Sequence, residues 1–170
     1  MKSGNENILI RLATDDDFET IYSIWLDGIK NSYDDTSIDP QTLKEKFSSN
    51  FNQRQGIFNF WVAVDAENKI WGWQSLVRCL NHPFKDNTYA ESSTYLSIEN
   101  RFKGLGKLLL GYVLKEAEKS SLEYVIGFVA TNNVAAIKIT KATGWIEVGI
   151  MPPSKSCKSK LTKLFLVRPV

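Results

Sequence analysis

Apolar side chains recur every three or four positions in the first third of the chain, which predicts two amphipathic helices. The first stripe consists of Phe18, Ile21, Tyr22, Trp25 and Ile29. The second helix carries Leu43 and Phe47 toward the interior. Thr14 offers a side-chain cap for the first helix, and Asp39 followed by Pro40 is typical of the cap and first position of the second.

Shorter segments of β-rich composition predict strands. The first is "ILIRLA" (8–13), and "FNFWVAVDAENKIWGWQSLV" (58–77) predicts a hairpin with a polar turn near Glu67 and Asn68. We expect further strands at "YAESSTYLSI" (89–98), at "YVIGFVA" (124–130), which we interpret as buried, at "WIEVGI" (145–150) and at "KLFLVRP" (163–169).

Two more helices are predicted in the second half of the chain. One follows residue 104 and gathers an apolar face from Leu105, Leu108, Leu109, Tyr112 and Val113, so it should lie on a sheet. The other, within 132–145, begins at an Asn and ends at Gly144. The order of elements predicts a mixed α/β fold whose central sheet is partly antiparallel and partly parallel.

Composition favours a single domain spanning residues 1–170. The 170 residues are 43% hydrophobic and include five Trp, nine Phe and six Tyr, which suffices for one core. The 21 Lys and Arg nearly balance the 19 Asp and Glu, without the long basic run of a nucleic-acid arm, so we expect no nucleic-acid partner. No apolar run is long enough to span a membrane, and no cleavable leader is evident.

The supply of reactive side chains excludes several familiar classes of enzyme. His82 is the only histidine, which argues against hydrolytic triads and against catalytic zinc sites, and we expect no metal site. It precedes Pro83 in a polar segment that is typical of an exposed loop. Cys79 and Cys157 lie far apart and lack metal-ligand spacing, which favours a cytoplasmic protein and leaves a disulfide open.

The segment "ENRFKGLGKLLLGYVL" (99–114) places two glycines and three cations where a helix is about to start. The first amides of a helix lack internal partners and carry a partial positive charge, so a strand, a glycine turn and a helix together form an anion site. Gly104 and Gly106 would let a phosphate approach the main chain, and Arg101, Lys103 and Lys107 would add favourable charge.

Two well-known phosphate motifs do not fit this turn. A P-loop would need Gly at position 101 and Ser or Thr at position 108, where the chain has Arg101 and Leu108. A dinucleotide fingerprint would need a third small residue at position 109, which is Leu109. The pattern that remains is Arg-x-x-Gly-x-Gly-Lys.

This pattern resembles the signature of the GNAT superfamily of N-acetyltransferases, which is Arg or Gln, two residues, Gly, one residue, then Gly or Ala. A second family marker lies downstream, and its positions are held here by Asn133, Ala136, Thr140, Gly144 and Trp145. The resemblance covers most of the chain, and "YAESSTYLSIENRFKGLG" is most similar to the phosphinothricin acetyltransferase branch. It implies a central, mostly antiparallel mixed sheet with helices on both faces.

The resemblance also implies acetyl-CoA as cosubstrate and a set of residues that hold it. The main chain of 103–107 would bind the pyrophosphate, and Asn133 would contact the pantetheine arm. The residues expected to bind the cofactor are Leu96, Ile98, Arg101, Phe102, Lys103, Gly104, Leu105, Gly106, Lys107 and Asn133.

Acetyl transfer to an amine needs a base, a site for the oxyanion and a fate for the leaving thiolate. We expect Glu91 to be the base, although a glutamate near a strand end is also typical of a solvated surface. By resemblance, a backbone N–H around Tyr95 or Leu96 would meet the oxyanion. Thr140 stands where many relatives have Tyr and some have His. Its hydroxyl titrates too high to be an efficient acid, so the catalytic role expected of Thr140 is only a hydrogen bond to the sulfur, and water can protonate the thiolate.

Three functions remain open from the sequence. The leading hypothesis is N-acetylation of a primary amine on a small molecule, such as an amino acid or its analogue, by direct attack in a ternary complex. The others are a non-catalytic acyl-CoA sensor and a protein N-terminal acetyltransferase. The basic loop 154–160 is interpreted either as a solvated surface or as an anion-attracting segment. The sequence leaves open whether the protein is a monomer or forms the homodimer that is common in the family.

Overall fold

One seven-stranded sheet runs through the computed structural model, which describes residues 8–30, 39–79, 87–100, 102–153, 155 and 161–170. Its strand order is β1-β2-β3-β4-β5-β7-β6. The strands are β1 (Leu9–Leu12), β2 (Phe60–Val64), β3 (Ile70–Arg78), β4 (Tyr89–Leu96), β5 (Tyr124–Ala130), β6 (Ile146–Met151) and β7 (Lys163–Pro169). Neighbouring strands are antiparallel except for β4 and β5, which are parallel.

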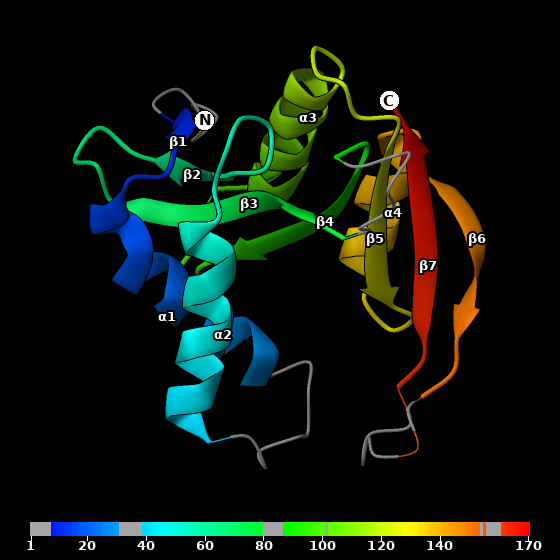
Figure 1. Ribbon diagram of the computed structural model, residues 1–170, viewed down its shortest axis with the longest axis horizontal. Helices are drawn as coiled ribbons and strands as arrows, with labels where there is room; N and C mark the ends of the chain where they lie inside the picture. The colour runs from blue at the N-terminus through cyan, green and yellow to red at the C-terminus, as the bar shows by residue number, and fades with distance from the viewer. Residues whose placement is uncertain (1–7, 31–38, 80–86, 101, 154, 156–160) are drawn as a thin grey trace.

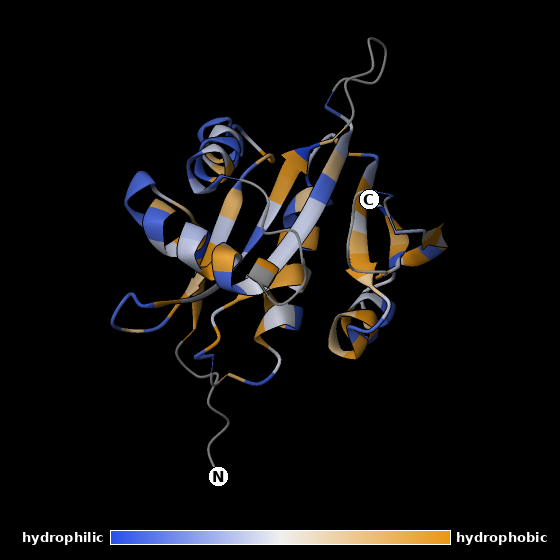
Figure 2. Cartoon of the chain, turned by 90° about the horizontal axis from the view of Figure 1, so that it is seen from below, coloured by the Kyte–Doolittle hydropathy of each residue, from blue (hydrophilic) through white to orange (hydrophobic). Residues whose placement is uncertain are grey.

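Helices cover both faces of the sheet, as expected (Figure 1). They are α1 (Phe18–Lys30), α2 (Pro40–Asn52), α3 (Leu105–Ala117) and α4 (Val134–Ala142), and a short 3-10 turn (Asp15–Asp17) precedes α1. Helices α1 and α2 lie in front of the β1–β4 half in this view, while α3 and α4 lie behind the sheet. Figure 2 shows that strongly hydrophobic residues lie along the strands and alternate with hydrophilic ones on the helices.

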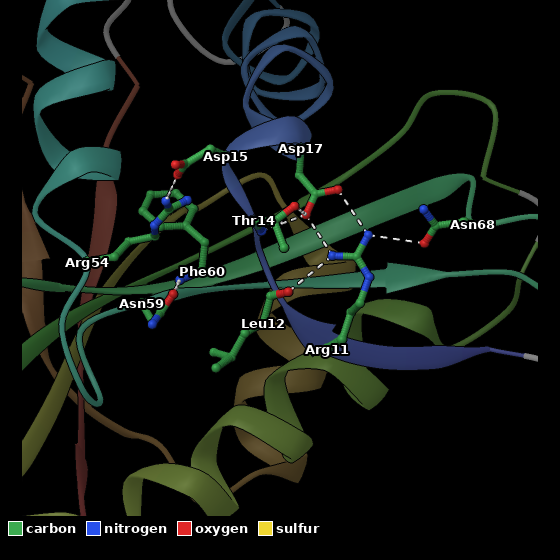
Figure 3. Close-up of polar contacts among 9 residues, drawn as sticks. All are labelled: Arg11, Leu12, Thr14, Asp15, Asp17, Arg54, Asn59, Phe60 and Asn68. Carbon is green, nitrogen blue, oxygen red and sulfur yellow. Dashed lines mark hydrogen bonds and ion pairs between the residues drawn. The ribbon is translucent and has the colours of Figure 1, made fainter.

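An ion pair fastens β1 to the start of α1 (Figure 3). Arg11 donates two hydrogen bonds to the Asp17 carboxylate, at 2.6 and 3.0 Å, and a third of 3.1 Å to Asn68 in the β2–β3 turn. The Thr14 N–H also donates to Asp17, at 2.7 Å. The Arg11 guanidinium and these other donors hold the pKa of the Asp17 carboxyl below its usual range.

The core beneath α1 and α2 is largely aromatic. Phe47 of α2 lies within 6.1 Å, between ring centroids, of Phe60 on β2 and Trp73 on β3. The Trp73 indole N–H donates a hydrogen bond of 3.0 Å to the Ile21 carbonyl, so the polar group of this bulky core residue has a partner. The aromatic members of this cluster and its border are Phe18, Tyr22, Trp25, Phe47, Phe51, Phe60, Trp73 and Tyr95.

The core on the opposite face is built on α3 and is mostly aliphatic, with Phe58, Trp61 and Trp71 as its buried aromatic residues. Its buried residues on α3 are Leu105, Leu109, Leu110, Val113, Leu114 and Ala117. The expected apolar face also included Leu108 and Tyr112, and this part of the prediction was wrong, because they are 41% and 39% exposed. Since α3 packs on β2, β3 and β4, its contact stripe includes positions 110, 114 and 117 instead.

Most local signals are confirmed. Asp39 caps α2 by accepting from the Thr42 N–H at 2.9 Å, and Asn133 caps α4 by accepting from the Ala136 N–H at 3.1 Å. Gly144 has a φ of +79°, as a helix-ending glycine requires. The segment 124–130 is a strand, but it is not buried throughout, because Phe128 is 38% exposed.

Candidate active site

Strands β4 and β5 pair at one end and then diverge. Their ladder consists of Tyr89 with Tyr124, Ala90 with Val125 and Glu91 with Ile126. Beyond that point β4 continues through residues 92–96 and β5 through residues 127–130, each paired only with its outer neighbour. We call these two segments the fork; their divergence is visible in Figure 1.

The sheet register determines which backbone groups face the fork. The Ser97 N–H donates 3.0 Å to the Trp71 carbonyl of the β3 side, so the odd-numbered residues of β4 turn their peptide groups toward β3. The even-numbered residues, including Thr94 and Leu96, therefore direct their N–H groups toward β5. Of the two positions expected to meet the oxyanion, Leu96 has this orientation and Tyr95 does not.

The glycine turn leads from β4 to the start of α3. Gly104 is the N-cap residue, with a φ of +79°, a conformation that side chains with a Cβ rarely adopt. Phe102 is anchored by its ring, 5.4 Å between centroids from Trp71, and by its N–H, which donates 3.0 Å to Asn100. The side chains of Lys103 and Lys107 are exposed. Arg101 lies outside the described residues.

Gly106 connects this turn to the fork and to α4. A Cβ built at Gly106 would lie 3.5 Å from the Ile139 side chain of α4 and 3.7 Å from the Leu96 side chain of β4. The first turn of α3 is therefore in contact with the open end of β4. Ile98 follows β4 and is exposed, and Asn133 is exposed at the start of α4.

Glu91 stands at the last rung of the ladder, where the fork begins. Its side chain lies on the α1 and α2 face, opposite Ala90, which packs with the α3 core. Burial raises the pKa of the Glu91 carboxyl, and the nearby Lys163 ammonium partly offsets this by lowering it. A carboxylate with a raised pKa is a stronger base, which suits proton removal from an amine.

Thr140 is buried on α4, and its hydroxyl is already engaged. It donates 3.0 Å to the Ile137 carbonyl of its own helix. A hydroxyl bonded in this way has no proton directed at a neighbouring ligand.

Sequence reasoning did not single out a polar set on β3 and β4. Gln74 is fully buried, donates 2.7 Å to the Ser92 hydroxyl and accepts a hydrogen bond from the Thr94 hydroxyl. The sequence feature that could have indicated this set is a single Gln inside the apolar segment "IWGWQSLV". Such a residue needs partners when it is buried.

Several other expectations concern reactive groups. Within the described ranges, no three His, Cys, Asp or Glu side chains are placed to hold a metal ion. Burial raises the pKa of the Cys79 thiol to about 11, which makes it a poor nucleophile at neutral pH. No helix in the described part of the chain could cross a membrane. His82, Cys157 and all of the basic segment 154–160 except Lys155 lie outside the described residues.

Comparison with known proteins gives the family. The sequence profile described as "Acetyltransferase (GNAT) domain" matches residues 7–146, most of the chain. The chain belongs to the GNAT acetyltransferase family. This GNAT assignment confirms the predicted class of enzyme, an N-acetyltransferase that uses acetyl-CoA as cosubstrate, and the mixed α/β fold.

Relatives of this GNAT enzyme include acetyltransferases of amino acid analogues. The Bacillus subtilis (strain 168) protein named "Putative phosphinothricin acetyltransferase YwnH" is 27% identical over 146 residues, covering 84% of this chain and 86% of the relative. An L-methionine sulfoximine/L-methionine sulfone acetyltransferase of Pseudomonas paraeruginosa (strain DSM 24068 / PA7) is 28% identical over 147 residues, covering 84% of this chain and 83% of the relative.

A solved structure agrees with the fold. It is a GNAT superfamily phosphinothricin acetyltransferase from Sinorhizobium meliloti in complex with AcCoA, with a TM-score of 0.77 and 22% identity, over 96% of this chain and 89% of the other. The predicted resemblance to the phosphinothricin branch is thereby confirmed at the level of sequence and fold neighbours.

Proposed function

We propose that this GNAT enzyme transfers the acetyl group of acetyl-CoA to the primary amine of an amino acid or amino acid analogue, by direct attack in a ternary complex. The observation that carries the proposal is the fork, which opens between Glu91 and the glycine turn. One end of the fork offers helix-start amides for a phosphate, and the other offers a carboxylate for a proton. The fork thus joins a binding site for the cofactor to a base, which is one of the requirements of acetyl transfer.

The cofactor would bind along β4 and the start of α3. The amides of 103–107 would hold the pyrophosphate, with Lys103, Lys107 and Arg101 supplying charge. Leu96 and Ile98 continue the line of β4 toward this turn, so they would accompany the pantetheine arm, and Phe102 would shape the turn. Asn133 would contact the same arm from the start of α4.

The chemical step would take place where the ladder ends. The Glu91 carboxylate would remove a proton from the substrate ammonium, directly or through water. The neutral nitrogen would attack the thioester carbonyl, and the Leu96 N–H, which faces the fork, would stabilise the oxyanion. Thr140 is a weaker candidate for assisting the sulfur, because its proton is bonded to the Ile137 carbonyl.

The class of acceptor follows from the relatives and from the charges near Glu91. The two curated relatives are named for phosphinothricin and for methionine sulfoximine or sulfone, which are small amino acid analogues. Lys163 places a cation in the electrostatic range of Glu91. A small acceptor that carries both an amine and an anionic group would complement this pair of charges.

A panel of acceptors tests the proposal. Purified protein with acetyl-CoA should release free thiol with at least one amino acid or analogue, while N-terminal peptides should be poor acceptors. Turnover on peptides alone would favour a protein N-terminal acetyltransferase. Binding of acetyl-CoA without turnover on any acceptor would favour the non-catalytic sensor.

Replacing the proposed base tests the mechanism. Glu91→Gln should lower kcat/KM by about 100-fold at neutral pH, within the usual range for loss of a general base. The deficit should shrink at high pH, where more of the amine is already neutral. A deficit that does not change with pH would remove Glu91 from the proton transfer.

The state of assembly is a separate proposal. We propose that residues 1–170 act as one domain, which the continuous sheet from β1 to β6 supports, and that two copies form a dimer. Ile146, Val148 and Ile150 on β6 are each more than half exposed, so an apolar surface is present for such contact. Light scattering during size-exclusion chromatography measures the mass directly.

A further inference from the structure

The thiolate that leaves CoA needs a hydrogen-bond donor, and Thr140 does not offer one. Its hydroxyl proton is bonded to the Ile137 carbonyl at 3.0 Å. The proposed function places the thioester in the fork, on the side reached from α3, because α3 begins at the glycine turn and a Cβ added at Gly106 would meet both Leu96 and Ile139. The donor should therefore be sought on the α3 face of β4.

Side chains alternate along β4, which identifies the residues on that face. Ala90 packs with the α3 core, and Leu96 packs beside Leu105 and Leu109. Ser92 and Thr94 lie between them on the same side of the strand. Ser92 is the first residue of β4 beyond the last pair with β5, so it stands at the base of the fork.

Gln74 organises the two hydroxyls. It faces Thr94 across the β3–β4 ladder, and its amide is fully buried. The Nε2 atom donates 2.7 Å to the Ser92 hydroxyl and lies 3.3 Å from the Ser75 carbonyl. Because a carbonyl oxygen accepts hydrogen bonds and cannot donate one, the atom of the Gln74 amide that lies beside the Ser75 carbonyl is assigned as the nitrogen.

That orientation gives the two hydroxyls different roles. Thr94 donates its proton to the Gln74 oxygen, so it has only lone pairs left to offer. Ser92 accepts from the Gln74 nitrogen, so its own proton remains to be donated. A buried amide is costly unless all its partners are kept, which explains how this arrangement stays fixed.

We propose that the Ser92 hydroxyl donates a hydrogen bond to the CoA sulfur as the thiolate leaves, and that Gln74 holds the hydroxyl in position. In the transfer, the amine nitrogen bonds to the acetyl carbon, the carbon–sulfur bond breaks, and its electron pair stays on sulfur. Glu91 passes the ammonium proton to solvent before the attack, and it takes the one further proton that the nitrogen loses as the amide forms. Ser92 keeps its proton throughout, and the released thiolate is protonated by water. Ser92 is thus a catalytic residue and Gln74 a positioning residue.

The thiol of bound CoA reports this contact without any turnover. A hydrogen bond donated to the thiolate stabilises the charged form and lowers the thiol pKa. Titration of the complex, followed by the ultraviolet absorbance of the thiolate, should give a lower pKa with the natural protein than with Ser92→Ala. Ser92→Thr, which keeps a hydroxyl, should restore the natural value, and Gln74→Met should shift it partway toward that of Ser92→Ala.

Binding of CoA and of desulfo-CoA, which lacks the sulfur, separates this contact from general damage to the fold. In alkaline solution the natural protein should prefer CoA by about 10-fold, as expected for a hydrogen bond to a charged group, and Ser92→Ala should lose the preference while binding desulfo-CoA normally. Ser93→Ala, on the other face of β4, is the matched control and should keep the preference. With saturating acceptor, kcat should fall about 10-fold in Ser92→Ala, with little change in the KM for acetyl-CoA.

The outcomes separate this inference from the proposed function. Equal thiol pKa values for natural protein and Ser92→Ala, with CoA bound by both, would overturn the role of Ser92 alone. Loss of the sulfur preference in Trp145→Phe but not in Ser92→Ala would also overturn it, because the Trp145 indole nitrogen is a buried donor with no partner among the described residues. Failure of the natural protein to bind CoA or desulfo-CoA would instead overturn the cofactor site itself.

Discussion

The two halves of the sheet are covered in different ways. Strands β2 and β3 lie between the largely aromatic core under α1 and α2 and the mostly aliphatic core under α3, so both of their faces are buried, whereas Leu9 and Leu12 of the edge strand β1 are exposed. In the half formed by β5, β7 and β6, Leu164 and Leu166 are buried, whereas Phe128, Ile146, Val148 and Ile150 are exposed. The first half is a scaffold that is packed on both sides at β2 and β3, and the second half is packed chiefly on one side.

The fork lies at the boundary between these halves, which explains how it can persist. On the scaffold side, β4 is held along its whole length by β3, and on the other side β5 is held by β7. Each strand thus keeps one full ladder of hydrogen bonds, while no other strand of the described residues pairs with the edge that faces the fork. Unpaired N–H and C=O groups at a strand edge can pair with another chain and cause aggregation. A bound ligand is one means of giving these groups hydrogen-bond partners.

The largest expected effect is on stability, when an aromatic ring is removed from each half of the sheet in turn. Phe47→Ala removes a 7% exposed ring from the aromatic core and should lower the free energy of unfolding by about 4 kcal/mol. Phe128→Ala, in the half-covered part, should cost only about 1.5 kcal/mol, because its ring is partly in water. Chemical denaturation of both variants measures the difference, and equal losses would show that the halves are equally packed.

The next largest effect is on CoA affinity, when Gly106 at the boundary between the two halves is replaced. Gly106→Trp should weaken CoA binding by about 100-fold, because a large side chain would occupy the space before the first amides of α3. Gly106→Ala should change affinity only a few-fold, since its Cβ would meet Leu96 and Ile139 at ordinary contact distances. Calorimetry with CoA measures both. Gly111→Trp, where a Cβ meets no atom within 4 Å, controls for a bulky residue on α3, and a similar loss there would argue against a local cofactor site.

A smaller effect lies within the scaffold half. Asp17→Asn should lower stability by about 2 kcal/mol at neutral pH, since it weakens the hydrogen bonds from Arg11 and Thr14. The folded pKa of Asp17 lies below its unfolded value, so its stabilisation is complete above the unfolded value of about 4 and is lost as pH falls through the folded one. Asp15→Asn, at an exposed carboxylate paired with Arg54, should change little. A penalty for Asp17→Asn that persists in strong acid would contradict this account.

The smallest expected effect is a shift in the pH dependence of activity, caused by a charge on one half of the sheet acting on a carboxyl of the other half. Lys163 on β7 lowers the pKa of Glu91 on β4, so Lys163→Met should raise that pKa and move the acidic limb of the kcat/KM profile to higher pH. Lys155→Met, a change of the same charge at an exposed position before β7, should leave the limb in place. An unchanged limb in Lys163→Met would separate Lys163 from the reaction.

The sequence predicted the local elements because their signals are local. The caps Asp39 and Asn133, the turn around Asn68 and the stop at Gly144 depend on residues a few positions apart, and the structure contains all four. The glycine turn was recognisable for the same reason. The buried stripe of α3 was only partly predicted, because the exposure of Leu108 and Tyr112 depends on where the helix lies on β2, β3 and β4.

The features that build the site depend on long-range pairing, and the sequence does not contain them in readable form. The position of β7 between β5 and β6 and the end of the β4–β5 ladder at Glu91 follow from register across strands. The place of Glu91 on the strand before the glycine turn and the resemblance to the phosphinothricin branch marked it as a candidate base, but neither showed that its side chain lies opposite the α3 face. The partners of Gln74 likewise become evident only when β3 and β4 are paired.

The opposite orientations of neighbouring side chains on β4 have a kinetic consequence. Glu91 and Ser92 point to opposite sides of the sheet. The amine and the thioester would therefore enter from opposite faces of the sheet and meet only in the plane of the strands. A bound amine then does not block the release of CoA, and bound CoA does not block the release of the amine. We expect that either one can arrive first, and that spent CoA competes with fresh acetyl-CoA but not with the amine.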